Sequence, residues 1–294
     1  GEGFRLNVVN AIWGQKGFQF TREYLDLLAL NYGAGMRIVD YQTAPEPARQ
    51  AINQWVADQT EDRIKDLLPQ GSITNLTRLV LTNAIYFNAA WATQFDKAST
   101  RQGQFTLLNG EKVSLPMMNQ FAKNYRYAEG DGYQAIELPY DGRELSMVIL
   151  LPRSGQYTNF ESRLDNTRLN SILAQMRNAA VDLSLPKFEI ETELNLNDHL
   201  KKLGMTDAFE FSKADLSGMN GNKELFISDV VHKAFVAVDE AGTEAAAATG
   251  VVVGVTSMPT DIKQFIVDRP FIFLIKDNPT GTVLFLGRIL NPLE

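Results

Sequence analysis

Long runs of strand-forming residues dominate this chain and constrain its fold more than any other feature. β-Branched and aromatic residues, which are typical of strands, fill or alternate through residues 4–13, 79–87, 181–190, 225–238, 271–275 and 282–289. Helical periodicity is shorter and lies between these runs, over residues 24–30, 45–61, 160–176 and 197–203. Asn109-Gly110 and Asp141-Gly142 are typical of hairpin turns. The pattern predicts an α+β fold with large, mostly antiparallel sheets.

Composition excludes several classes of function. The 294 residues include no cysteine, which excludes disulfides, thiolate metal sites and a cysteine nucleophile. The only histidines are His199 and His232, too few for a multi-histidine metal cage. We therefore expect no metal and no cofactor. The formal net charge of −7 has the wrong sign for a protein that binds phosphate backbones, so we expect no nucleic-acid partner.

Neither a membrane segment nor a catalytic motif is found. The longest weakly polar stretch, residues 245–255, is far shorter than the ~20 residues needed to cross a bilayer, and the chain as given shows no signal peptide. No G-x-S-x-G elbow or histidine-based metal motif is present. The acidic pairs Glu61-Asp62 and Asp239-Glu240 are expected in exposed turns, as solvated charges. These observations predict a soluble protein that is not an enzyme and has no membrane partner.

The segment from Asp239 to Pro259 does not resemble a core strand. It reads DEAGTEAAAATGVVVGVTSMP, with small residues in its first half and β-branched residues in its second. If it is extended, one face consists only of Thr, Ala and Val from Thr243 to Val255, without any charge. Such a face can enter between existing strands without steric or desolvation cost. A flexible Ala/Gly linker is the alternative, but a linker has no need of one uncharged face.

This segment and several motifs, in this order along the chain, resemble the serpin family of serine protease inhibitors. The run from Glu240 to Thr249 resembles the hinge of the serpin reactive-centre loop. The other matching motifs are 81–87 with Trp91, then Glu137–Tyr140, Leu183–Phe188, Ala214–Met219, His232–Phe235, Arg269–Phe273 and Gly287–Pro292. A match to any one of these motifs is weak evidence, but matches to all of them in the order of the family are specific.

The resemblance implies the serpin fold over residues 1–294 as a single domain. The reactive-centre loop then covers about residues 240–262. The chain begins at what resembles the second strand of the large sheet, so the first helices of the family have no counterpart here. Because their absence would expose a large apolar patch, we expect this chain to be a truncated or partial serpin.

The mechanism implied is that of a suicide substrate. A serine protease cuts the loop, forms an acyl-enzyme, and is trapped in a covalent complex when the cut loop inserts as a strand into the large sheet. Thr243 is the first hinge residue that must turn inward, and Gly242 serves the turn of the hinge. The hinge residues implied by the resemblance are Glu240, Gly242, Thr243, Glu244, Ala245, Ala246, Ala247 and Ala248.

The family's hinge spacing, counted from Glu240, places the reactive-site bond at Thr256-Ser257. Val253, Val255 and Met258 are its neighbours in the bait sequence. A small β-branched residue before the bond suits elastase-like or subtilisin-like proteases. Trypsin-like proteases are disfavoured, because no Lys or Arg lies between Ala241 and Asp261.

Three further residues match positions that the family uses. Asn83 and His232 match the central polar cluster beneath the strands that separate, where His232 is expected to be a hydrogen-bonded core histidine. Trp91 matches the tryptophan at the end of the sheet where insertion begins. The resemblance implies a secreted, extracellular monomer. The alternative is a non-inhibitory serpin that acts as a binding or chaperone protein or as a simple protease substrate, although the small residues of the hinge favour inhibition.

Overall fold

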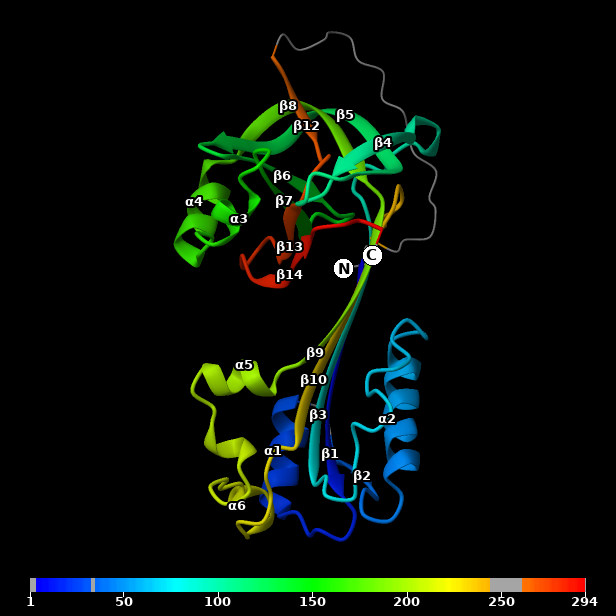
Figure 1. Ribbon diagram of the computed structural model, residues 1–294, viewed down its shortest axis with the longest axis vertical. Helices are drawn as coiled ribbons and strands as arrows, with labels where there is room; N and C mark the ends of the chain where they lie inside the picture. The colour runs from blue at the N-terminus through cyan, green and yellow to red at the C-terminus, as the bar shows by residue number, and fades with distance from the viewer. Residues whose placement is uncertain (1–3, 33–34, 244–260, 294) are drawn as a thin grey trace. The chain divides into compact units, whose positions relative to one another are not determined.

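The computed structural model describes residues 4–32, 35–243 and 261–293, and these fall into two compact units. The first unit takes its described residues from Gly1–Arg5, Phe87–Ile190 and Val236–Glu294, and the second from Leu6–Tyr86 and Glu191–Phe235. Strands β3 (Leu79–Ala90) and β10 (Asp229–Val238) contribute residues to both units (Figure 1).

The second unit is built around long strands of a six-stranded sheet. The sheet has the order β2-β1-β3-β11-β10-β9, and β3 also pairs directly with β10. The further strands of the sheet are β1 (Phe4–Gln15), β2 (Arg37–Val39), β9 (Phe188–Asn195) and the short β11 (Gly242–Thr243), whose two residues belong to the first unit. In this unit β1 pairs with β2, and β3 with β10, in parallel register. The long strands expected at 4–13, 79–87 and 225–238 are therefore present, with shifted ends.

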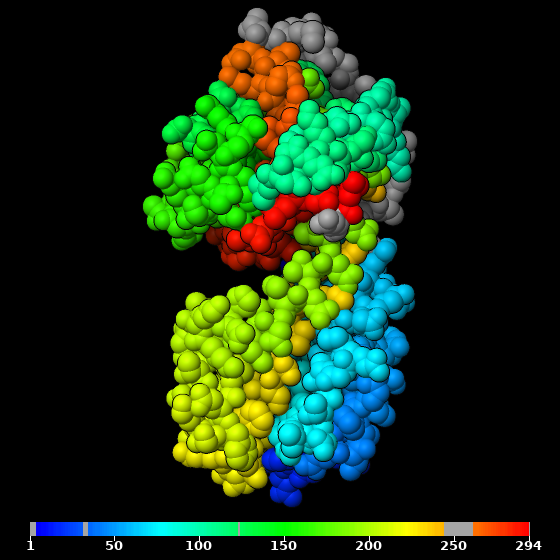
Figure 2. Space-filling model, viewed as in Figure 1, coloured from blue at the N-terminus to red at the C-terminus, as the bar shows by residue number. Residues whose placement is uncertain are grey.

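Helices flank these strands. They are α1 (Arg22–Tyr32), α2 (Pro45–Gln59), α5 (Asn197–Lys202), α6 (Ser217–Asn220) and the 3-10 turn Asp207–Phe209. Figure 2 shows the segment that carries α5 and α6 (yellow-green) on one side of β10 (yellow) and the α2 region (blue to cyan) on the other. In α2, Ile52 and Val56 are fully buried, and Trp55 meets Trp13 edge to face at 5.3 Å. The amphipathic helix predicted from its apolar face is confirmed.

The first unit contains an eight-stranded sheet of the order β12-β8-β5-β6-β7-β13-β14, with β4 paired to β5. Its strands are β4 (Arg101–Thr106), β5 (Lys112–Gly130), β6 (Tyr133–Pro139), β7 (Leu145–Pro152), β8 (Arg177–Pro186), β12 (Ile262–Ile266), β13 (Phe271–Asp277) and β14 (Val283–Ile289). Adjacent strands are antiparallel except for the parallel pair β8 and β12. The two predicted hairpins are confirmed as β4–β5 and β6–β7.

Two short helices cover part of this sheet, and the helix expected between Phe160 and Met176 is present but shorter than those bounds. Residues 160–176 do not form one helix but α3 (Tyr157–Glu161) and α4 (Asn166–Gln175); the turn Lys97–Ser99 is a separate 3-10 helix. The break arises because the Asp165 carboxylate accepts the backbone N–H of Arg168 at 2.7 Å and caps a new helix. Phe160 of α3 and Ile172 of α4 pack on the buried Val148 and Leu274 of the sheet (Figure 1).

The prediction of a single strand over residues 181–190 was wrong, because the chain passes from one sheet to the other there. β8 ends at Pro186, and β9 begins at Phe188 as the edge of the six-stranded sheet. Proline has no backbone N–H for a further ladder hydrogen bond, and the N–H of Lys187 donates to the Pro116 carbonyl at 3.1 Å. The α+β class with large, mostly antiparallel sheets is confirmed.

Candidate functional site

The expected loop is only partly within the described residues. Glu240, Gly242 and Thr243 are described, whereas Glu244, the four alanines Ala245, Ala246, Ala247 and Ala248, the bait residues Val253, Val255 and Met258, and the expected bond Thr256-Ser257 lie outside them. The described part of the site is therefore the start of the loop, the strands beside it, and the chain from Asp261 onward.

The start of the loop lies between the two central strands of the six-stranded sheet. Thr243 pairs with Val238 of β10 on one side and with Ala89 of β3 on the other, and Gly242 pairs with Ala90. β11 is therefore hydrogen-bonded on both of its edges, as an inner strand of a sheet is. Antiparallel pairing on both sides gives this two-residue strand the same direction that a continuing strand would need.

Gly242 occupies a position that has no room for a side chain. A Cβ atom built there would lie 2.1 Å from the Ala89 carbonyl oxygen and 2.7 Å from the Ala90 Cα. Both contacts are with backbone, which cannot move aside as a flexible side chain can. Glycine is therefore required for the close approach of β11 to β3.

Replacing Gly242 with alanine is expected to push β11 away from β3. Forcing a methyl group into a filled backbone contact costs about 1–3 kcal/mol of folding free energy, measured as the free energy of unfolding in denaturant. Gly218→Ala is the matched control, because a Cβ there meets no heavy atom within 4 Å. Equal unfolding free energies for Gly242→Ala and the parent protein would contradict the packing described.

Thr243 is fully buried, and its hydroxyl is bound to an aromatic stack. Its Oγ1 lies 2.7 Å from the Tyr140 hydroxyl. The Tyr140 ring in turn stacks on Trp91 at 4.7 Å, with an interplanar angle of 6°, and meets Phe87 edge to face. Burial raises the pKa of Tyr140, so its hydroxyl keeps its proton and remains able to donate. The expected inward residue of the hinge thus sits in a preformed, neutral environment.

Trp91 holds the turn that leads into β11. Its indole Nε1 donates to the Asp239 carbonyl at 3.0 Å, and its backbone N–H donates to the Ala241 carbonyl at 2.9 Å. The Asp239 carboxylate accepts the N–H groups of Ala241 at 2.8 Å and Gly242 at 3.2 Å. Side-chain and backbone bonds therefore close the turn from both sides. The structure thus places Trp91 beside the turn that leads into β11.

Glu240 is buried, contrary to the expectation that the Asp239-Glu240 pair is a solvated charge in an exposed turn. It is only 4% exposed. Its carboxylate accepts from Lys187 Nζ and from Thr100 Oγ1, each at 2.8 Å, and its backbone carbonyl accepts the N–H of Phe95 at 2.9 Å. A buried carboxylate needs such partners, because without them its desolvation would be too costly. The local sequence gave no sign of them.

These contacts set the charge state of Glu240. Burial by itself raises the pKa of the carboxyl group, but the hydrogen bonds from Lys187 and Thr100 outweigh it and hold the pKa below the ordinary value of 4.5. A lowered pKa in the folded state means that the pair stabilises the hinge above pH 4.5, and that this contribution is lost as the pH falls through the lower value. The hinge is thus tethered by an ionic contact at neutral pH.

Asn83 and His232 lie opposite each other where β3 and β10 pair directly. His232 Nδ1 donates to Asn83 Oδ1, and Asn83 Nδ2 donates to Asn10 Oδ1 of β1 at 2.6 Å. The two residues therefore link three strands within the second unit. Burial lowers the pKa of His232, because the charged imidazolium is poorly solvated there. The structure brings together the two residues expected in a central polar cluster.

The His232 contact predicts a pH dependence of stability. With a lowered pKa in the folded state, the unfolded chain binds the proton more readily, so stability is fully present above the ordinary pKa of 6.5 and falls as the pH drops through the folded value. Denaturation midpoints at about pH 8 and pH 5.5 should show this loss, above the range in which carboxylates titrate. His232→Gln should reduce the difference, whereas exposed His199→Gln should leave it intact; equal effects would contradict the assignment.

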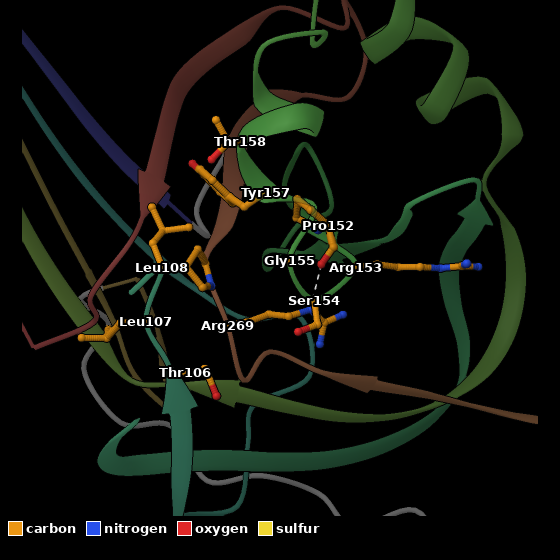
Figure 3. Close-up of a pocket in the computed structure, with 11 residues that line it drawn as sticks. Thr106, Leu107, Leu108, Pro152, Arg153, Ser154, Gly155, Tyr157, Thr158 and Arg269 are labelled. Atoms are coloured by element: carbon orange, nitrogen blue, oxygen red, sulfur yellow. Dashed lines mark hydrogen bonds between the residues drawn. The ribbon is translucent and has the colours of Figure 1, made fainter. Parts of the chain in front are cut away.

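The far end of the loop is anchored to the first unit. After Asp261, β12 runs parallel to β8. Arg269 Nε then donates to the Pro152 carbonyl at 2.7 Å, drawn as a dashed line in Figure 3, and Arg269 Nη1 forms a 2.6 Å ion pair with Asp268. The Asp268 carbonyl accepts the N–H of Thr106 at 2.8 Å. Both described ends of the loop are therefore held by side-chain as well as backbone bonds.

The residues that sequence reasoning missed are the partners of the hinge. Tyr140 and Lys187 lie within motifs that carry the family resemblance. These motifs identify the family but do not indicate what the two side chains contact. Asp239 was placed in an exposed turn, and Thr100 and Phe95 carry no local signal at all. Their roles arise from pairings between segments far apart in the sequence, such as Thr100 with Glu240.

The described residues contain neither a metal-binding cluster nor a membrane-spanning helix. In residues 4–32, 35–243 and 261–293, no three His, Cys, Asp or Glu side chains gather where they could hold a metal ion. No helix in that part of the chain is long and apolar enough to cross a membrane.

Comparison with known proteins assigns the family. The family model for serpins, described as serine protease inhibitors, matches residues 1–292. An uncharacterized serpin-like protein of Thermococcus kodakarensis is 43% identical, over 100% of this chain and 68% of its own length. Human leukocyte elastase inhibitor is 42% identical, over 99% of this chain and 79% of its own length. The native-state crystal structure of the thermophilic serpin tengpin is similar, with a TM-score of 0.90 and 31% identity, over 99% of this chain and 74% of that one.

The fold, the family model and the relatives thus all define the same class of protein. The chain belongs to the serpin family.

Proposed function

We propose that this protein inhibits serine proteases as a suicide substrate, by inserting its cut reactive-centre loop into the six-stranded sheet. The observation that carries the proposal is the position of β11. Its two residues already lie between β3 and β10, with Thr243 fully buried and paired on both edges. A continuing strand would extend β11 in the same direction and position.

Insertion requires β3 and β10 to separate where they now pair directly, from Val80–Tyr86 against Asp229–Phe235. The cost is the loss of that ladder and of the Asn83–His232 hydrogen bond. The gain is larger, because a strand of about a dozen residues forms hydrogen bonds on both edges, at about 0.5–1.5 kcal/mol each, or on the order of 10 kcal/mol in total. The small, uncharged face from Thr243 to Val255 adds no steric or desolvation cost.

We place the bait bond at Thr256-Ser257, with Val253, Val255 and Met258 as its neighbours. Small and β-branched residues before the bond suit the small first pocket of an elastase-like or subtilisin-like protease. The relationship to leukocyte elastase inhibitor, whose name states its target, supports the first of these classes. Residues 256 and 257 lie outside the described part of the chain, so the bond is assigned from sequence alone.

Several further properties belong to the proposal. The protein acts without a cofactor and is not itself an enzyme; its partner is the target protease, with which it forms a covalent complex. It acts as a monomer and outside the cell, where such proteases are secreted. The two compact units of the described chain would work as one serpin domain, because insertion involves strands that contribute residues to both.

The experiment is a titration of pancreatic elastase and of subtilisin with the protein, with trypsin as the comparison. Stoichiometric loss of elastase or subtilisin activity is expected, together with a C-terminal peptide whose mass corresponds to a start at Ser257. Trypsin should retain its activity, because no Lys or Arg lies between Ala241 and Asp261. Cleavage of the loop with full activity of all three proteases would instead show a simple substrate, as expected of a non-inhibitory serpin.

A further inference from the structure

The first unit contains a polar cavity that the inhibitory mechanism does not use. Its volume is about 550 Å³, which is within the range of small-molecule sites. Its walls come from strands β5, β6, β7, β8 and β13 and from the turns that follow β6 and β13. Three cationic side chains line it, Arg126, Arg143 and Lys276, against one carboxylate, Glu137. The lining therefore carries an excess of two positive charges in a protein whose net charge is −7.

Glu137 fixes two of these cations in place. Its Oε2 accepts from Arg126 Nη1 at 2.9 Å, and its Oε1 accepts from Lys276 Nζ at 3.0 Å. The side chains of Glu137 and Lys276 are both more than nine-tenths buried. One carboxylate cannot neutralise two cations, so positive charge remains at the site. Water screens the buried Lys276 ammonium poorly, whereas the Arg126 side chain is 47% exposed. Lys276 Nζ also donates to Asn278 Oδ1 at 2.6 Å.

The third cation is Arg143, and the side chain of Asn278 holds the Arg143 backbone in place. Asn278 Nδ2 donates to the Arg143 carbonyl at 2.9 Å and to Ser146 Oγ at 2.8 Å. Arg143 has a φ of 59°, a left-handed conformation that is strained for a non-glycine residue. A strained residue persists where its surroundings hold it, and here the Asn278 amide does so. The Asn278 hydrogen bond therefore holds the Arg143 backbone in an unfavourable conformation at the rim of the cavity.

The chemistry of the lining selects the ligand. Apart from Pro139, every lining residue is charged or carries a hydrogen-bonding side chain, including the amides of Asn124 and Asn178. Arginine and lysine side chains are the usual partners of phosphate oxygens. The cavity is much larger than a phosphate ion, and amide and hydroxyl groups suit the hydroxyls of a carbon skeleton. We infer that this cavity binds a small phosphorylated polar molecule, with its phosphate among Arg126, Lys276 and Arg143.

The test is isothermal titration of the full chain with three probes: glucose 6-phosphate, inorganic phosphate and glucose. At low ionic strength, where charge interactions are least screened, glucose 6-phosphate should bind more tightly than phosphate, and glucose should not bind. Arg126→Gln and Arg143→Gln should each weaken glucose 6-phosphate by about tenfold or more, since each removes a charged hydrogen-bond donor. Thermal unfolding of the free variants shows whether they remain folded.

Arg163→Gln is the matched control, because Arg163 is an exposed arginine of the same unit that does not line the cavity. It should leave the affinity for glucose 6-phosphate unchanged. Three results would overturn the inference: no binding of either phosphate probe up to about 20 mM, binding of glucose as tight as that of its phosphate, or an equal loss in the control. Inhibition of elastase should be unchanged in all three variants, so this test is independent of the proposed function.

Discussion

Replacing Thr243 with arginine is expected to convert the protein from an inhibitor into a substrate. Thr243 is fully buried between β3 and β10, and its hydroxyl lies 2.7 Å from that of Tyr140. An arginine there would either bury a guanidinium beside the neutral phenol, at a cost of several kcal/mol, or force β11 out of the sheet. In both cases insertion should stall at its first residue. The fraction of elastase trapped should fall about tenfold or more, while the loop is still cut.

Thr243→Val is the control that separates charge from shape. Valine keeps the branched shape and loses only the hydrogen bond to Tyr140, a change of about 0.5–1.5 kcal/mol. It should therefore retain most of the trapping. The measurement is the ratio of trapped to cleaved protein on a denaturing gel. Trapping by Thr243→Arg equal to that of the parent protein would show that Thr243 does not need to enter the sheet.

Replacing Glu240 with lysine is expected to have the largest effect on stability. The substitution removes the acceptor of Lys187 and Thr100 and places a second ammonium group beside Lys187, in a position that is 4% exposed. Removing one partner of a buried ion pair typically costs about 3–5 kcal/mol. Because the Lys187 side chain is 38% exposed, the lower end of that range is expected. The measurement is the free energy of unfolding in denaturant.

The double variant with Lys187→Glu and Glu240→Lys is the control for charge. It exchanges the charges of residues 187 and 240 and restores a pair of opposite charges. It should therefore recover part of the stability lost by Glu240→Lys. Hydrogen exchange at Ala241 and Gly242, whose N–H groups are held by Asp239, should accelerate in the single variant. An unchanged unfolding free energy with unchanged exchange would mean that the ion pair does not hold the hinge.

Much of the fold could be predicted because it follows from local patterns. Period-two alternation predicted β10 and β14, and the Asn-Gly and Asp-Gly turns predicted two hairpins, because glycine permits the tight turns that join adjacent strands. The boundaries that failed depend on single residues. Asp165 caps a new helix within residues 160–176, where the periodicity indicates one helix. Pro186 ends β8 within residues 181–190, where the alternation indicates one strand.

The hinge was predictable only in part, for a different reason. The small-residue run and its uncharged face are visible in the sequence, and the family resemblance implies that Thr243 is the first inward residue. The burial of Glu240 is not visible, because its partners Thr100 and Lys187 are 140 and 53 residues away. The Tyr140 hydroxyl is likewise brought to Thr243 only by the pairing of strands. Long-range contacts of this kind carry no local pattern.

The most direct test of trapping by loop insertion is a denaturing gel of the protein after incubation with pancreatic elastase at equal concentrations. A band that contains both proteins and survives denaturation is expected, with release of a small C-terminal peptide. Such a band requires a covalent acyl-enzyme that was trapped before hydrolysis. Complete conversion to the cleaved protein, with no such band and with elastase fully active, would contradict trapping by insertion.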